Sequence, residues 1–214
     1  MRSRYRIFET GYPYFMTCTI AGWLPVFTRP ETVEFVYSSW RFLAEQADFK
    51  LYGYVILENH LHLIASAPEL ANAIKRFKMY TARQIVDHLE SRGAQTLLRQ
   101  LQAQKRRHKT QSDYQVWEEG YMPKQIITDE MMLQKMEYIH DNPVKRGYVD
   151  EPIHWRYSSA RNYAGLPGLM DVVTDCGGRE TEFRGSAFPN GVWERGGKLV
   201  RKTEFRGSAF PNGS

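Results

Sequence analysis

The stretch that most constrains the fold is Gly53–Ser66, where two short apolar runs flank a polar turn at Glu58-Asn59. This pattern predicts a β-hairpin whose second strand opens with His60 and His62. Side chains two residues apart in a strand point to the same face, so the two imidazoles stand side by side. Imidazoles placed in this way can share one divalent metal ion. The alternative is a half-exposed strand whose two histidines bind nothing.

The segments before this hairpin predict the rest of the sheet. Residues 12–20 are aromatic and β-branched with a rough period of two, which is typical of a strand. Pro30 followed by Glu31 predicts a helix start, and apolar residues then recur at helical spacing as far as about Asp48. The order strand, helix, strand, strand opens a split βαβ arrangement. We therefore predict an α+β fold of ferredoxin-like type, an antiparallel sheet with helices packed on it.

Two further helices are expected after the hairpin. The first runs from Leu70 to about Leu89, and Gly93 ends it. The second begins after Thr128, a good N-cap, and proline ends it at Asn142-Pro143. Residues 113–127, between them, are expected to form a hairpin or the remaining strand.

Cations gather at three places along the chain and are our candidates for contacts to a nucleic-acid backbone: an N-terminal arm, the polar face of the 70–89 helix, and a cluster in the polar segment 99–112, expected to be a mobile loop or a helix end. A basic helix face can follow a phosphate backbone, and a basic loop adds salt-sensitive affinity. The alternative is an ordinary solvated surface. The candidates are Arg4, Arg6, Lys75, Arg76, Lys78, Arg83, Lys105, Arg106 and Arg107.

Tyr138 and Asn142 lie four residues apart, so they share one face of the second helix. If this face packs over the histidine strand, it delivers a phenolic hydroxyl and an amide oxygen to the metal. A carbonyl oxygen suits a hard cation such as Mg²⁺ or Mn²⁺, so Asn142 is a candidate third ligand. The alternative for Tyr138 is an ordinary helix aromatic, and Tyr80, among the cations of the earlier helix, is a rival nucleophile.

Three motifs occur in one order: the His60-Leu61-His62 run, the block from Tyr138 to Tyr148 that reads YIHDNPVKRGY, and WRYSS at 155–159. Over about residues 5–165 this combination resembles the REP-associated tyrosine transposases, relatives of the IS200-like transposases in the HUH superfamily. The resemblance implies that His60 and His62 are the paired metal-binding histidines and that Tyr138 is the nucleophile. It places Asn142 at the position of a polar third ligand.

The resemblance implies a metal-dependent transposase or endonuclease with Mg²⁺ or Mn²⁺ as cofactor. Its tyrosine would form a 5′-phosphotyrosine link and free a 3′-hydroxyl, and later rejoining would need no ATP. The expected partner is single-stranded or hairpin DNA from short palindromic repeats, and the protein is a monomer or a homodimer. The first alternative is a domesticated protein that binds hairpins without cutting them. A replication or plasmid-relaxation enzyme is the next alternative, and a metallohydrolase that uses water is the last.

Composition sets weaker limits on the chain. Its two cysteines, Cys18 and Cys176, show no metal spacing and suggest a reducing compartment. We find no signal-like start and no apolar run long enough to span a membrane, so a cytoplasmic protein is expected. The net charge is +5. Because seven Lys and Arg against four Glu lie beyond residue 175, the charge of the remainder says little about DNA.

The C-terminal part changes character and carries an internal repeat. We divide the chain into a transposase-like domain at 1–165 and a tail at 166–214, which we expect to be disordered because it is rich in Gly, Arg and Ser. Residues Thr181–Gly191 recur without a mismatch as Thr203–Gly213. The copies are either a bivalent basic DNA-binding tag or the trace of a DNA repeat into which the reading frame runs.

Overall fold

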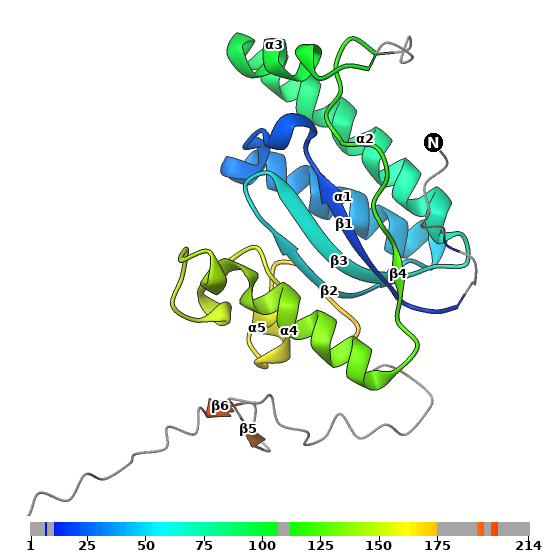
Figure 1. Cartoon of the computed structure of the whole chain (residues 1–214), viewed down its shortest axis with the longest axis vertical. Helices are drawn as coiled ribbons and strands as arrows, with labels where there is room; N and C mark the ends of the chain where they lie inside the picture. Colours follow the sequence, from blue (N-terminus) through cyan, green and yellow to red (C-terminus); the bar gives the residue numbers. More distant parts are fainter. Residues whose placement is uncertain (1–6, 8–10, 107–111, 175–191, 195–197, 201–214) are drawn as a thin grey trace, which may run out of the picture.

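A computed structural model of the chain describes residues 7, 11–106, 112–174, 192–194 and 198–200 (Figure 1). Among these residues no helix is both long and apolar enough to cross a membrane. The strands are β1 (Tyr14–Thr19), β2 (Lys50–Ile56), β3 (His60–Ser66), β4 (Lys124–Gln125), β5 (Val192–Glu194) and β6 (Lys198–Val200). The α-helices are α1 (Pro30–Ala47), α2 (Leu70–Ser91), α3 (Gln95–Ala103), α4 (Asp129–Lys145) and α5 (Ala160–Tyr163), with short 3₁₀ turns at Ala21–Trp23, Val26–Thr28 and Pro152–His154.

The first four strands form an antiparallel sheet in the order β2-β3-β1-β4. Strand β3 lies between β1 and β2, the two strands that α1 connects, and this is the split βαβ arrangement. The predicted α+β fold is therefore confirmed. The tight turn after β2 is also as predicted, since the amide of Leu57 donates to the carbonyl of His60 at 2.9 Å.

Helices cover both faces of this sheet (Figure 1). On one face, α1 and α2 pack on the larger core, which takes Leu61 and Leu63 from β3 together with Trp40 and Phe77 from the helices. On the other face, α4 packs on a smaller cluster that includes Ile64 of β3. Because side chains alternate along a strand, His60 and His62 lie on the same face as Ile64, which is the α4 face.

The free edge of β2 is covered by the chain that follows α4. The amide of Ile56 donates to the carbonyl of Tyr157, and Tyr54 exchanges hydrogen bonds with Ser159. Covering an edge strand in this way removes a template for unwanted strand pairing. The packed chain continues past residue 165, since Met170 is buried in the larger core.

One buried polar network holds α4 against this edge. The imidazole Nε2 of His140, on α4, lies 2.8 Å from the Ser159 hydroxyl. That hydroxyl also accepts from the Tyr54 amide at 2.9 Å. Burial lowers the pKa of His140 to about 3, so the ring is neutral. The network links α4, β2 and the segment after α4, and so sets where α4 lies over the sheet.

The predicted end of α4 is wrong, because the helix continues through Pro143 to Lys145. A proline costs a helix the one bond its own nitrogen would donate and crowds the preceding turn. Pro143 lies in the last turn, and the bonds beyond it survive: the amide of Arg146 donates to the carbonyl of Asn142, and that of Tyr148 to the carbonyl of Pro143. The helix face that carries Tyr138 is therefore longer than predicted.

The structure defines three further segments. Helix α3 reaches into the polar segment 99–112, expected to be a mobile loop or a helix end, because Leu98 and Leu101 bury one side of a short amphipathic helix. Of the two alternatives for residues 113–127, the structure shows the remaining strand, β4. In the tail, β5 and β6 pair as a small antiparallel ladder that joins Val192 to Val200, Trp193 to Leu199 and Glu194 to Lys198; Val and Trp favour strands. The predicted disorder of the remaining tail, including both repeat copies, lies outside the described residues.

Candidate active site

His60 and His62 stand next to each other on β3, as the two-residue period predicts. Their ring centroids are 5.0 Å apart and the rings are nearly perpendicular. The strand is not half-exposed, because the two residues are only 3% and 5% exposed. A buried pair of imidazoles needs polar partners, and these partners set what the rings can bind.

Each histidine has one ring nitrogen engaged. Nδ1 of His60 lies 2.7 Å from the side-chain oxygen of Asn59, whose amide nitrogen in turn donates to the carbonyl of Trp23 at 3.3 Å. An amide oxygen only accepts, so the proton is on Nδ1 and the lone pair of Nε2 is free. Nδ1 of His62 lies 2.8 Å from the Thr17 hydroxyl, while its buried Nε2 has no hydrogen-bond partner in the part of the chain that the structure describes.

Burial keeps both rings neutral. It lowers the pKa of His60 to about 4, with a further contribution from the positive charge of Arg146. It lowers the pKa of His62 to about 3, helped by His60 and again by Arg146. Near pH 7 both histidines are therefore uncharged, which is the form that ligates metals.

Tyr138 of α4 lies against this pair. Its ring meets that of His62 edge to face, with centroids 5.2 Å apart, and contacts Phe15 of β1 at 5.8 Å. The residue is 42% exposed, so its side chain is accessible to a large substrate. The structure thus brings together the tyrosine and the histidines, which are far apart in the sequence.

The C-terminal end of α4 lies toward the turn that precedes β3. Tyr138 contacts His62, and eight residues further along the chain the guanidinium of Arg146 pairs with Glu58 of that turn at 3.1 Å. Asn142 lies between these two contacts in the sequence, on the face of α4 that carries Tyr138, and is 8% exposed.

The donor set fits a divalent metal ion. Within the part of the chain that the structure describes, no three His, Cys, Asp or Glu side chains are grouped closely enough to hold a metal. The histidine pair offers two neutral nitrogens, one of them a buried orphan, and a third ligand would have to be of another type. The amide oxygen of Asn142, on the face of α4 that carries Tyr138, is a candidate of another type. Asn59 and Thr17 lie within hydrogen-bond distance of Nδ1 of the two histidines, where metal-binding histidines usually have an outer partner.

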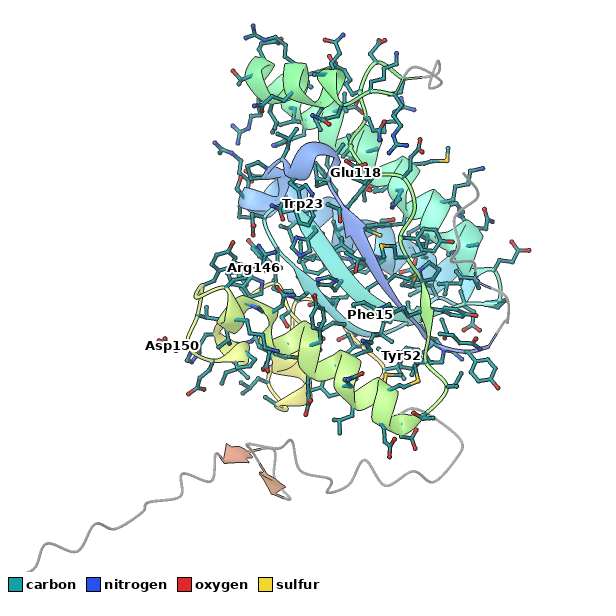
Figure 2. The ribbon with its side chains drawn as sticks, in the orientation of Figure 1. Phe15, Trp23, Tyr52, Glu118, Arg146 and Asp150 are labelled. Carbon is teal, nitrogen blue, oxygen red and sulfur yellow. The ribbon has the colours of Figure 1, made fainter. Side chains whose placement is uncertain are left out.

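Two residues beside the pair were not singled out from the sequence (Figure 2). Trp23 meets the His60 ring edge to face at 5.5 Å and is 59% exposed. Arg146 flanks the same end of the site through Glu58. A helix read past Pro143 would have placed Arg146 on the face of Tyr138, but nothing in the sequence around Trp23 indicates its position.

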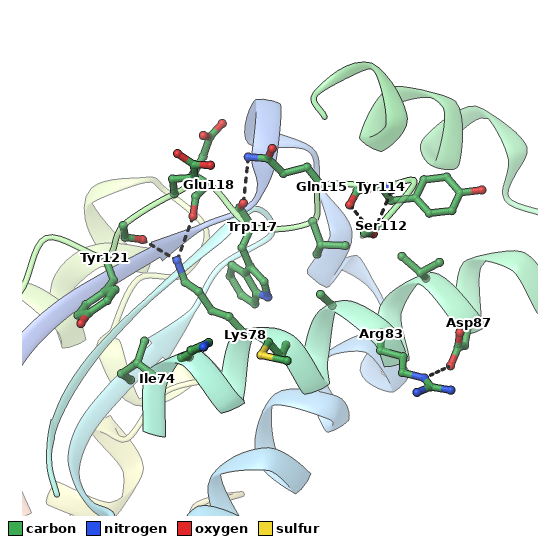
Figure 3. Close-up of a pocket in the computed structure, with 17 residues that line it drawn as sticks. Ile74, Lys78, Arg83, Asp87, Ser112, Tyr114, Gln115, Trp117, Glu118 and Tyr121 are labelled. Carbon is green, nitrogen blue, oxygen red and sulfur yellow. Dashed lines mark hydrogen bonds and ion pairs between the residues drawn. The ribbon is translucent and has the colours of Figure 1, made fainter. Parts of the chain in front are cut away.

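The predicted cations of α2 lie on the far face of the sheet from the histidines. Figure 3 shows Lys78 beneath the segment 112–121, which runs along β1. Its ammonium donates to the carbonyls of Glu118 and Gly120 at 3.0 and 2.6 Å, so it fastens this segment to α2. A cavity of about 690 Å³ lies between them.

The remaining candidates are dispersed. Arg83 pairs with Asp87 on its own helix, and Arg76 lies over the ring of Phe42 on α1. Tyr80 lines a separate cavity between α1 and α2, so the rival nucleophile is on the opposite face from the histidines. Two further candidates are ion-paired, Lys105 with Asp113 and Arg106 with Glu118 and Glu119. Lys75 is exposed on α2, and Arg4, Arg6 and Arg107 lie outside the described residues.

Fold and site together define a ferredoxin-like α+β domain that presents two neutral histidines and a tyrosine on one face of its sheet. No protein-family model matches the chain. The chain is 25% identical over 154 residues to a Haemophilus influenzae protein that carries the provisional name REP-associated tyrosine transposase; the match covers 72% of this chain and 82% of that protein.

A solved transposase structure shares the fold. The structure of a REP-associated tyrosine transposase bound to a REP hairpin superposes with a TM-score of 0.57 at 17% identity, over 82% of this chain and 96% of that one. A provisionally named transposase from Deinococcus radiodurans, 16% identical over 66% of this chain and 96% of that one, superposes with a TM-score of only 0.37. The resemblance to the REP-associated tyrosine transposases is thus confirmed by sequence and by fold.

Proposed function

We propose that this protein cleaves and rejoins single-stranded DNA at hairpin repeats, with Tyr138 as the nucleophile. The observation that carries the proposal is the contact of Tyr138 with His62, whose buried Nε2 has no hydrogen-bond partner among the described residues. Support for the substrate comes from the relatives, because the solved transposase that shares the fold is bound to a REP hairpin.

The histidines would hold a divalent ion, Mg²⁺ or Mn²⁺, through Nε2 of His60 and of His62, with Asn142 as third ligand. A bound ion of this kind withdraws charge from the scissile phosphate and orients it. The protein keeps the two nitrogens ready for this role, since Asn59 fixes the tautomer of His60 and burial keeps both rings neutral.

Tyr138 carries out the covalent step. Its hydroxyl oxygen attacks the phosphorus, a Tyr–O–P bond forms and the bond from phosphorus to the 3′ oxygen breaks. The tyrosine proton passes to solvent, and the leaving 3′ oxygen takes one up. The product is a 5′-phosphotyrosine and a free 3′-hydroxyl. Because the new phosphodiester conserves the bond, attack by a 3′-hydroxyl rejoins DNA and returns the proton to Tyr138.

The test uses end-labelled hairpin oligonucleotides copied from the repeats that flank the gene, incubated with purified protein and Mn²⁺ or Mg²⁺. We expect a denaturant-resistant protein–DNA adduct that forms with wild type and with Tyr80→Phe but not with Tyr138→Phe. Tyr80→Phe is the matched control, because Tyr80 is 44% exposed and Tyr138 42%. Tight hairpin binding with no adduct under either metal would contradict the proposal and support a protein that binds hairpins without cutting.

A further inference from the structure

The end of the site beyond His60 has two unused groups that suit one nucleotide. Trp23 presents an exposed indole beside His60, and Arg146 presents a guanidinium beside Glu58. Both are tied to the turn that precedes the histidine strand: Asn59 bonds to the Trp23 carbonyl and to the His60 ring, and Glu58 pairs with Arg146. An aromatic face and a cation held against the same turn are the two elements with which proteins hold a single-stranded nucleotide.

The backbone at Trp23 is the unusual part of this end. Trp23 has a φ of 57°, in the left-handed region that residues other than glycine rarely adopt. A strained conformation that exposes 59% of a large aromatic residue gains nothing for the core. It does hold the indole at the edge of the His60 ring.

Arg146 has capacity left for a phosphate. The described contacts of its side chain use one nitrogen, Nη1, on Glu58, whereas a guanidinium has five N–H donors. Its side chain is 35% exposed, and the Glu58 carboxylate fixes its position. Arginine in a fixed position is well suited to bind phosphate oxygens.

The direction of the reaction assigns this end to one side of the cut. The rings follow one another in the order Tyr138, His62, His60 and Trp23. In phosphoryl transfer the attacking and leaving oxygens lie roughly in line on opposite sides of phosphorus. If Tyr138 attacks from the His62 side, the leaving 3′ oxygen and its nucleotide point toward His60 and Trp23.

We propose that Trp23 and Arg146 form a subsite for the nucleotide that leaves with the 3′-hydroxyl: its base stacks on the Trp23 indole, and the phosphate on its 5′ side binds Arg146. This inference rests on the proposed function, because it takes Tyr138 as the nucleophile. It adds a base-stacking residue and a phosphate ligand, on the side of the cut away from the phosphotyrosine.

The experiment pairs protein variants with chemically altered DNA. Three hairpin oligonucleotides are compared: unmodified, abasic at the nucleotide just 5′ of the mapped cut, and carrying a neutral methylphosphonate at the next phosphate upstream. Binding is measured by fluorescence anisotropy and adduct formation by single-turnover kinetics. The variants are Trp23→Ala, Trp23→Phe, Arg146→Gln and Arg146→Lys. Controls away from the site are Phe42→Ala, an exposed aromatic of α1, and Arg92→Gln, an exposed arginine paired with Glu31.

Each variant should lose affinity only for DNA that carries the group its side chain binds, the base for Trp23 and the charged phosphate for Arg146. Trp23→Ala should lower the affinity for unmodified DNA about tenfold, which is the effect of one lost base stack. It should leave the affinity for abasic DNA unchanged. Trp23→Phe should recover most of the loss. Arg146→Gln should lower the affinity for unmodified DNA about tenfold and change the affinity for methylphosphonate DNA little. Arg146→Lys should recover part of the lost affinity. The controls should match wild type on all three.

Equal losses on modified and unmodified DNA would overturn the subsite, and so would wild-type binding by Trp23→Ala. Thermal melting of each variant identifies any that does not fold, and Trp23→Phe and Arg146→Lys then supply the same comparison. If wild type forms no adduct at all, the proposed function fails separately. The abasic and methylphosphonate positions are then scanned along the single-stranded flank by anisotropy, and the absence of any Trp23-dependent position refutes the subsite.

Discussion

Replacing Gly53 by alanine should disturb the packing of α4 on the sheet and slow the reaction that we assign to Tyr138. Gly53 lies in β2 directly beneath Met136, two residues before Tyr138 on α4. A Cβ atom on Gly53 would lie 2.9 Å from Cε of Met136 and closer still to its Sδ. Met136 is 4% exposed, so its side chain has little free space into which to move.

Forcing a methyl group into such a contact costs about 2 kcal/mol of unfolding free energy. For a protein of this size that corresponds to a fall in Tm of roughly 4–8 °C, measured by calorimetry or dye-monitored melting. The flexible end of Met136 takes up part of this displacement and α4, lifting from the sheet, takes up the rest, so Tyr138 moves with the helix. A shift of about 1 Å at a reacting group can cost on the order of a hundredfold in rate, so the single-turnover rate of adduct formation should fall at least tenfold.

A compensating change makes the reasoning testable. Met136→Val removes both Sδ and Cε, the atoms that the new Cβ would meet. The double variant Gly53→Ala/Met136→Val should be more stable, by about 1 kcal/mol, than the sum of the two single effects predicts. Gly53→Ala with unchanged Tm and rate, or strictly additive effects in the double variant, would refute the argument that this glycine sets the height of α4.

Two other consequences are independent of DNA cleavage. At a hundredfold excess over its Kd, Mn²⁺ should stabilise the wild-type protein by about 2.7 kcal/mol and so raise its Tm. Removing the metal with a chelator should abolish this rise, and so should the double variant His60→Ala/His62→Ala. An equal rise in the variant would place the metal elsewhere. Ser159→Ala should cost about 1–3 kcal/mol in urea unfolding, because it leaves buried groups of His140 and Tyr54 without a partner; a loss below about 0.5 kcal/mol would show that the network does not hold α4.

The fold followed from local patterns that tertiary contacts did not override. The alternation around Glu58-Asn59 and the proline before Glu31 correctly predicted the β2–β3 hairpin and the start of α1. The exit of α4 did not follow, because the cost of Pro143 depends on how many helical bonds lie beyond it. In the last turn that cost is small.

The sequence predicted the proximity of site residues only where they lie on the same helix or strand. His60 and His62 share a strand, so their proximity followed from the two-residue period, whereas their burial did not, since it depends on α4 covering them. Lys78 looked like a surface cation, but its carbonyl partners at 118 and 120 belong to a segment that packs on α2 from 40 residues away. Trp23 lies beside His60 only because a left-handed turn after β1 places it there.

The most direct test of the central claim is to identify the residue that becomes linked to DNA. Trypsin releases Tyr138 in the peptide Met136–Lys145, in which it is the single tyrosine, and Tyr80 in Met79–Arg83. After adduct formation and nuclease digestion, mass spectrometry should find a nucleotide on Met136–Lys145. A nucleotide on Met79–Arg83, or on any other peptide, would contradict the account and move the active site away from His60 and His62.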